Sequence, residues 1–263
     1  DNGGYAGHGR INSIGFHPTD NNKIYVGTAG GGFWISEDGG NTWMTTTDDL
    51  GALGVSGIAV DPVNPLNIYI ATGDGDAADN YSIGVYKSTD GGLTFAPTGL
   101  NWSSSGGNVI RRIIFDPSNA NTLFVATNSG IYKTTDAGTT WNLKQSGNFY
   151  DIEANPNSVS NTFFASTSSS VFRSINAGEN WVATYTISGS NRVSIAVTPT
   201  DTNYVYALSS NSSNNGFKGL YRSTNGGQNF SLRSSTPNIL GWDEAGGGTG
   251  GQGSYDLALA ADP

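Results

Sequence analysis

The sequence contains no cysteine, so no disulfide can brace the fold and no thiolate can bind a metal. His8 and His17 are the only imidazoles, which leaves too few ligands for a zinc enzyme. Charged residues make up only 13% of the 263 residues, and the net charge is −9. Binding a nucleic-acid backbone needs clustered Lys and Arg, so this balance argues against a nucleic-acid partner.

Long apolar runs are also missing, and no stretch approaches the roughly 20 apolar residues that span a bilayer. The first ten residues, DNGGYAGHGR, lack the charged and apolar regions of a signal peptide. We therefore expect any such signal to be removed or to lie upstream. The lack of cysteine, the single methionine and the abundance of Ser, Thr, Asn and Gly fit an extracellular or cell-surface protein.

What the sequence has in abundance is one eight-residue phrase, which occurs five times. Successive copies start 52, 46, 40 and 49 residues apart, and repeats of this length are typical of propellers, solenoids and arrays. The five copies are SEDGGNTW at 36–43, STDGGLTF at 88–95, TTDAGTTW at 134–141, SINAGENW at 174–181 and STNGGQNF at 223–230.

Apolar runs surround each phrase in the same order. Two runs joined by a Pro, Asn and Asp turn come first, as in IGFHPTDNNKIYVGT at 14–28 and IAVDPVNPLNIYIAT at 58–72, and they indicate a hairpin. A third short run precedes the phrase and a fourth follows it. Four antiparallel strands per repeat form a propeller blade. The sequence therefore predicts an all-β fold, a β-propeller with five complete blades and the phrase between the third and fourth strands.

The phrase itself is interpreted as a turn. Its glycines supply positive φ, its hydroxyl and carboxylate groups bond backbone N–H groups, and its aromatic ring is expected to be buried between neighbouring sheets. Asn176 and Asn225 replace the carboxylate in two copies, which keeps a turn but would not keep an acid catalyst. The predicted structural residues are Ser36, Asp38, Gly39 and Trp43; Ser88, Asp90, Gly91 and Phe95; Thr134, Asp136, Gly138 and Trp141; Ser174, Asn176, Gly178 and Trp181; and Ser223, Asn225, Gly226 and Phe230.

The pattern S-x-D-x-G-x-x-W after an aliphatic–aromatic pair resembles the Asp-box, also called the bacterial neuraminidase (BNR) repeat. Asp-boxes occur in sialidases, in sortilin-type receptors and in two-propeller glycosidases that cut xyloglucan, so the box implies a propeller and no single activity. The stretches GRINSIGFHP, GDGDAADNYSIGVYKSTDGG, VIRRIIFDP and GWDEAGGGTGGQGSYDLALAADP together resemble the sortilin-like propeller of large secreted surface proteins of Bacteroidetes, which carry type IX secretion signals. This resemblance covers essentially the whole chain.

In such proteins SYDLALAADP opens a further blade. We therefore expect residues 1–263 to form one propeller domain, with five complete blades and the first strand of a sixth, in a ring of about seven blades. The resemblance implies that the remaining blades lie in the same polypeptide or a partner chain, and that the ligand is a glycan or a protein at the cell surface.

The resemblance to enzymes is less complete. Sialidases need three arginines, a tyrosine with a glutamate, and an aspartate, but the Arg-Ile-Pro signature is missing, and outside the phrases only Glu153 and Glu244 remain as bases. The xyloglucan-cutting family carries a catalytic aspartate in a T-D-x-G-G-like stretch of its first blade. Here that stretch is GTAGGGFW, with Ala29 in the position of the carboxylate.

Three groups of residues are candidate sites. Asp74, Asp76 and Asp79 lie within six residues of one another in a Gly-containing loop, an arrangement of oxygen ligands that suits structural Ca²⁺, although a solvated turn explains it as well. Charges recur where the channel-lining strands begin, and they predict either a ligand site or a ring of ion pairs: Arg10, Arg111, Arg112, Asp151, Arg192 and Asp256. Trp102 and Trp242 lie in irregular loops, where a ring can stack on a sugar or pack beneath the loop.

The sequence thus favours a secreted or cell-surface propeller that acts as a non-catalytic binding, adhesion or structural module. The alternative is a xyloglucanase-like or sialidase-like glycoside hydrolase, which would need two carboxylates facing one groove.

Overall fold

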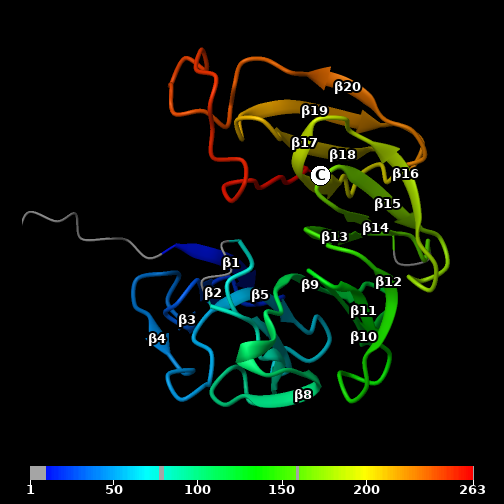
Figure 1. The fold of residues 1–263 in the computed structure, drawn as a ribbon. Helices are drawn as coiled ribbons and strands as arrows, with labels where there is room; N and C mark the ends of the chain where they lie inside the picture. Colours follow the sequence, from blue (N-terminus) through cyan, green and yellow to red (C-terminus); the bar gives the residue numbers. More distant parts are fainter. Residues whose placement is uncertain (1–9, 77–79, 158–159, 263) are drawn as a thin grey trace, which may run out of the picture. The chain divides into compact units, whose positions relative to one another are not determined.

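The computed structural model describes residues 10–76, 80–157 and 160–262. Within these ranges, 20 strands form five four-stranded antiparallel sheets, and the only helical element is a 3₁₀ turn, η1 (Ser104–Gly106). Each sheet contains four strands that are consecutive in the sequence, as the colours of Figure 1 show. The sheets are the blades of a β-propeller, which confirms the predicted fold.

The blades follow one another along the chain. The first contains β1 (Ile11–Phe16), β2 (Ile24–Thr28), β3 (Phe33–Ser36) and β4 (Met44–Thr45). The second contains β5 (Val55–Val60), β6 (Ile68–Thr72), β7 (Gly84–Ser88) and β8 (Ala96–Asn101). The third contains β9 (Ile110–Asp116), β10 (Asn119–Thr127), β11 (Gly130–Thr134) and β12 (Asn142–Ser146). The fourth contains β13 (Asp151–Ala154), β14 (Phe163–Ser166), β15 (Ser170–Ser174) and β16 (Val182–Thr186). The fifth contains β17 (Ser190–Val197), β18 (Val205–Asn211), β19 (Phe217–Ser223) and β20 (Ser231–Ser234).

The chain divides into two compact units, residues 1–113 and 114–263. The first unit holds the first and second blades, and the second unit holds the fourth and fifth. The boundary falls within β9 of the third blade. The single propeller domain over residues 1–263 stays a prediction.

Each repeated phrase forms the turn between the third and fourth strands of its blade. In the second blade, the Ser88 hydroxyl accepts the Gly92 N–H at 2.8 Å and donates to the Asp90 carboxylate at 2.7 Å. Asp90 also accepts the hydroxyl of Thr94 at 2.6 Å and its N–H at 3.0 Å. These bonds, led by that from the Thr94 hydroxyl, lower the pKa of Asp90 to about 2. Asn176 Oδ1 accepts the same pair of donors in the fourth blade, from Ser174 and from the Asn180 N–H.

Two consecutive residues in each turn have positive φ, whereas the sequence predicted only a single such residue per turn. The second is glycine in all five copies, whereas Ala137 and Ala177 hold the first position at φ 55° and 56°. Glycine at the second position also has a packing reason. A Cβ on Gly227 would lie 2.5 Å from Cε1 of Phe164 in the preceding blade.

Among the residues that the structure describes, three apolar clusters lie between consecutive blades. One joins Phe33 and Ile35 of the first blade to Ile68 and Ile70 of the second. Another joins Phe124 and Ile131 of the third blade to Ile152 and Trp181 of the fourth, and the last joins the fourth blade to the fifth around Phe164. The core of each unit is therefore built from contacts between sheets. This follows because side chains alternate between the two faces of a strand, and the apolar face is buried against the neighbouring sheet.

Two expectations need correction. Trp43 was predicted to be buried, but 39% of its surface is exposed, whereas Trp181 at the same position in the fourth blade is buried against Phe124. Within the described residues, no strand follows Ser234, so the predicted first strand of a sixth blade is not formed. Asp256 lies instead in a turn, because its N–H donates to the carbonyl of Gln252 at 2.9 Å.

Candidate functional site

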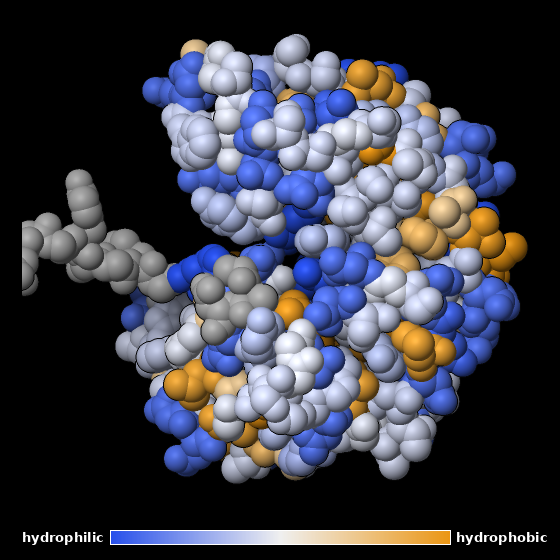
Figure 2. All heavy atoms as spheres, viewed as in Figure 1, coloured by the Kyte–Doolittle hydropathy of each residue, from blue (hydrophilic) through white to orange (hydrophobic). Residues whose placement is uncertain are grey.

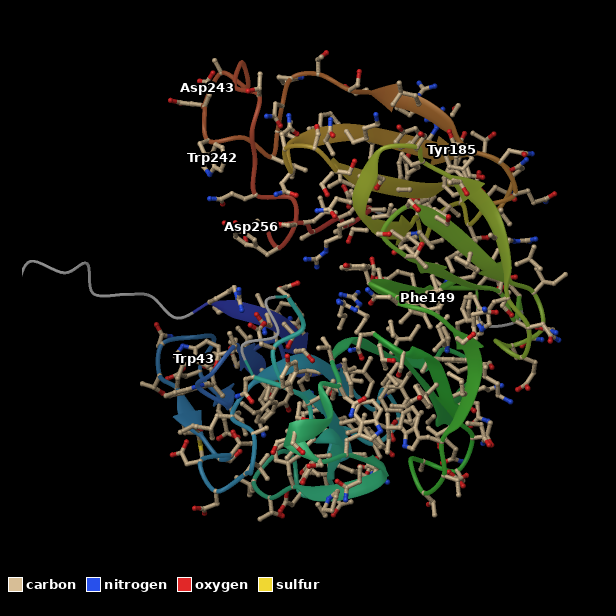
Figure 3. The ribbon with its side chains drawn as sticks, viewed as in Figure 1. Trp43, Phe149, Tyr185, Trp242, Asp243 and Asp256 are labelled. Atoms are coloured by element: carbon tan, nitrogen blue, oxygen red, sulfur yellow. The ribbon has the colours of Figure 1, made fainter. Side chains whose placement is uncertain are left out.

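The loop that follows β20, residues 235–257, holds two of the predicted site residues, Trp242 and Asp256, and is called the Trp242 loop here (Figure 3). It folds back on the fifth blade through Asn238, whose amide donates to the carbonyls of Gly248 and Gly250 at 2.8 and 2.9 Å. The Asn238 side-chain oxygen accepts the N–H of Phe217 in β19 at 2.7 Å. One side chain therefore joins the glycine-rich segment to the sheet.

Trp242 is the most exposed tryptophan of the described residues, with 69% of its surface accessible. Its ring lies over Gly250, where a Cβ would approach Cζ3 to 2.5 Å. When the Gln252 amide is oriented to suit both neighbours, its oxygen accepts the Trp242 indole N–H at 2.8 Å, and its nitrogen donates to Asp256 at 2.6 Å. The ring is therefore held in place from below and at its edge while a large part of it faces solvent.

Three carboxylates belong to the same loop as this ring. Asp243 is engaged within the loop, since it accepts the N–H groups of Ala245 and Gly247 at 3.1 and 3.0 Å. Glu244 and Asp256 are both exposed. A cavity of about 310 Å³ lies beside the ring, with Pro237, Ile239 and the side chains of residues 242–244 in its lining. The surface of this loop is mostly hydrophilic or neutral (Figure 2).

Two predicted charges from the inner strands of the second unit lie at the base of this loop or beneath it. The Arg192 guanidinium donates to the carbonyls of Ser254 and Tyr255 at 3.1 and 3.2 Å, and it stacks over the Tyr150 ring at 5.8 Å. Asp151 has a structural role, because it accepts the N–H of Ile195 at 2.8 Å and so joins β13 to β17. Arg192 therefore positions the loop, and Asp151 stabilises the sheets below.

The other predicted charges lie in the first unit. Arg10 forms an ion pair with the buried carboxylate of Asp74, which also accepts the Asn12 amide at 3.1 Å. Arg111 and Arg112 belong to β9, where the first is half-buried and the second exposed. Trp102 is half-buried and donates its backbone N–H to Ile83 at 3.0 Å. The shared channel for these charges stays a prediction.

The predicted calcium site is only partly described. Asp79 lies outside the described residues, the Asp74 carboxylate is engaged by Arg10 and Asn12, and Asp76 donates its N–H to Asp74 at 3.1 Å. Among the residues that the structure describes, no group of three or more His, Asp or Glu side chains gathers around one point. Calcium binding stays a prediction.

The sequence did not single out Asn238, Gly250 or Gln252, although they fix Trp242 in place. Glycine and amide residues are ordinary loop components, so no local pattern marks them as supports of an aromatic ring. Their role follows only from contacts made across the loop.

No family model matches the sequence. Among curated proteins, the chain is 32% identical over 160 residues to the "Probable oligoxyloglucan-reducing end-specific xyloglucanase" of Neosartorya fischeri, which covers 57% of this chain and 19% of that protein. It is 30% identical over 154 residues to the xyloglucanase Xgh74A of Acetivibrio thermocellus, covering 54% of this chain and 18% of that protein. The chain thus spans less than a fifth of the length of these relatives.

Among solved structures, the GH74 enzyme of Niastella koreensis superimposes with a TM-score of 0.68 and 26% identity, covering 91% of this chain and 41% of that one. YCF48 from Cyanidioschyzon merolae shares the fold alone, with a TM-score of 0.54 and 15% identity over 86% of this chain and 85% of that one. The described part of the chain contains no helix long and apolar enough to cross a bilayer.

Proposed function

We propose that the protein is an extracellular glycoside hydrolase that acts on xyloglucan, and that the Trp242 loop forms part of its glucan-binding surface. The observation that carries this proposal is the exposed Trp242 ring, fixed by Gly250 and Gln252, in a chain that is 32% identical to a xyloglucanase over more than half its length. Flat indole rings suit stacking against the apolar face of a sugar. Glu244 and Asp256 would accept hydrogen bonds from its hydroxyl groups.

Hydrolysis needs two carboxylates on either side of the glycosidic bond. Asp74, Asp151 and Asp243 are each engaged by protein donors. Asp243 is held by two backbone N–H groups, whereas Glu244 and Asp256 are exposed carboxylates of the same loop. Among the bonds described above, Asp256 accepts one from the Gln252 side chain alone. Glu244 and Asp256 are therefore the first to replace, as Glu244→Gln and Asp256→Asn. Loss of turnover in either variant with binding retained would assign the reaction to this loop. Unchanged turnover in both would assign it to carboxylates elsewhere in the protein.

A second candidate function is non-catalytic glycan binding, and a specific observation favours it. Ala29 occupies the position where the xyloglucanase resemblance implies a catalytic aspartate. Its N–H donates to the Arg10 carbonyl at 3.1 Å, and the residues lining the nearby cavity include no carboxylate within the described part of the chain. A propeller of this kind would hold a glucan chain without cleaving it.

Incubation of the full-length protein with xyloglucan separates the two functions. We expect binding in affinity gel electrophoresis together with new reducing ends and released oligosaccharides. Retention on xyloglucan without any products would establish the binding module. Neither binding nor products would contradict both functions.

A further inference from the structure

The fourth strand of each blade is an edge of its sheet, because it pairs with the third strand alone. An edge strand presents unpaired N–H and C=O groups that can pair with another chain. Natural sheets protect such edges by short length, charged side chains or proline. The fourth strands are β4, β8, β12, β16 and β20, and Figure 1 shows β16 beyond β15 in its sheet.

Four of these strands carry such protection. β4 is only two residues long, β8 contains Pro97, β12 contains Lys144 and β20 contains Arg233. β16 has the sequence VATYT, without charge, proline or glycine, and the uncharged stretch around it covers residues 180–191. A register shift occurs in the pairing of β12, β16 and β20 alike, so it does not distinguish them. Among the described fourth strands, β16 is therefore the unprotected one.

Two charged residues flank β16, and both are engaged elsewhere. Glu179, in the turn before the strand, accepts bonds from two lysine ammonium groups at 2.7 and 2.6 Å. Arg173 of β15 is the register partner of Val182, but its guanidinium lies at the turn of the fifth blade, 3.8 Å from where a Cβ on Gly226 would be. The strand is therefore neutral in a protein whose net charge is −9.

The strand is also held in an extended form with one side open. The Tyr185 ring packs against two aromatic rings of the fifth blade, with centroids 5.7 and 5.4 Å away. The Ile187 N–H donates to the Ser169 carbonyl at 2.7 Å. Successive N–H groups of a strand point in opposite directions, so the N–H of Thr186 points to the open side. At the start of the strand, Val182 is 64% exposed.

The chemistry of β16 fits a second copy of the same chain. Antiparallel pairing of two β16 strands about a two-fold axis uses the open side of both, so the assembly ends at a dimer. It brings valine and threonine side chains together, which suit cross-strand pairs. The same pairing at β12 or β20 would bring Lys144 or Arg233 towards its own copy, and like charges oppose such pairing.

We propose that β16 pairs with β16 of a second copy of this chain, which joins two four-stranded sheets into one continuous sheet. Five paired residues bury less surface than the roughly 1,200 Å² of stable interfaces, so the dimer is weak and depends on concentration. This contact is independent of whether the protein cleaves glucan.

Sedimentation velocity of the full-length protein, from roughly 1 to 500 µM, tests the proposal. We expect the sedimentation coefficient to rise with concentration from that of a monomer to that of a dimer. In the double variant Val182→Lys/Thr186→Lys, a pair centred on residue 184 brings lysines opposite one another. Its dissociation constant should rise at least about tenfold. Val182→Thr/Thr186→Val keeps the strand neutral and is the matched control, which should associate like the unmodified protein.

A mixture of variants identifies the contact. Val182→Glu/Thr186→Glu should also be monomeric by itself, and mixing it with the lysine variant should restore dimers, because opposite charges then face each other. Dimers that persist in the lysine variant would assign association to another surface and overturn the proposal. A mixture that stays monomeric, or an unmodified protein that is monomeric at every concentration, would overturn it as well.

Should the charged variants fail to fold, hydrogen exchange in the unmodified protein gives a second test. We expect exchange of the open-side N–H groups of β16, that of Thr186 among them, to slow as protein concentration rises, because they then donate to the second copy. Exchange in β12 and β20 should not change with concentration. Equal behaviour of the three strands would contradict pairing through β16.

Discussion

Phe33 of β3 and Phe95, the last residue of the second repeated phrase, pack edge to face with ring centroids 5.2 Å apart and planes at 76°. Their contact joins the first blade to the second. Gly92 lies in the same contact, because a Cβ there would lie 2.8 Å from Cε1 of Phe33. The repeated phrase thus does more than close a turn, since it brings a glycine and an aromatic ring onto the preceding blade.

Gly92→Ala should therefore destabilise the protein. The added methyl group meets Phe33, and the backbone φ of 94° disfavours an L side chain. We expect a loss of roughly 1–3 kcal/mol in the free energy of unfolding, measured by urea titration. Gly30→Ala is the control, because nothing lies within 4 Å of its Cβ. Equal stability of the two variants would contradict the packing role.

The hydrogen bonds of the turn predict a difference between two replacements in one phrase. Ser88→Ala removes the buried acceptor of the Gly92 N–H, so we expect a loss of roughly 1–3 kcal/mol. Asp90→Asn should have a smaller effect, because Asn176 and Asn225 accept the corresponding bonds in other copies. Thermal unfolding of both variants tests this order, and a greater loss in Asp90→Asn would reverse it.

The three acidic turns predict a pH dependence. Hydrogen bonds lower the pKa of Asp38, Asp90 and Asp136 from 3.8 to about 2 in the folded protein, chiefly from the side chains of Thr42 and Thr94 and from the Thr140 backbone N–H. A depressed folded pKa gives stability that is present above pH 3.8 and is lost as the pH falls towards 2. Because these three carboxylates are exposed to solvent, their contribution to the free energy of unfolding is small.

Melting temperatures between pH 5 and pH 2 test this dependence, with the triple Asn variant at the same three positions as the comparison. We expect the fall in Tm across this range to be smaller in the triple variant, because amides do not titrate. An identical fall would show that other groups determine acid stability.

Lys133 links the third blade to the turn of the fourth. Its ammonium donates to the Ala177 carbonyl and to Glu179, both at 2.7 Å, and lies 5.5 Å from the centre of the Phe124 ring. Lys133→Met should cost roughly 1–3 kcal/mol, because it leaves the Ala177 carbonyl without this donor. Lys144→Met removes the more exposed partner of Glu179 and should cost less than about 1 kcal/mol. Urea titration of both variants measures the difference, and equal costs would contradict it.

The repeats allowed the fold to be predicted more completely than the site. Every phrase contains the hydroxyl, the hydrogen-bond acceptor and the glycine that its turn needs. The turn of each blade can therefore be predicted from the local sequence. The exposure of Trp43 was not predictable in this way, because a ring at this position is buried only by the preceding blade. Trp242 was selected as a loop aromatic, but its support by Gly250 and Gln252 depends on contacts that no periodicity encodes.

Calorimetric titration of the full-length protein with xyloglucan oligosaccharides tests the central proposal most directly. We expect Trp242→Ala to weaken binding roughly tenfold or more, as loss of an exposed aromatic anchor does, and Trp242→Phe to retain part of the affinity. Leu232→Ala, an exposed apolar residue of β20, is the matched control and should bind like the unmodified protein. Unchanged affinity in Trp242→Ala would contradict the assignment of this loop to glucan binding.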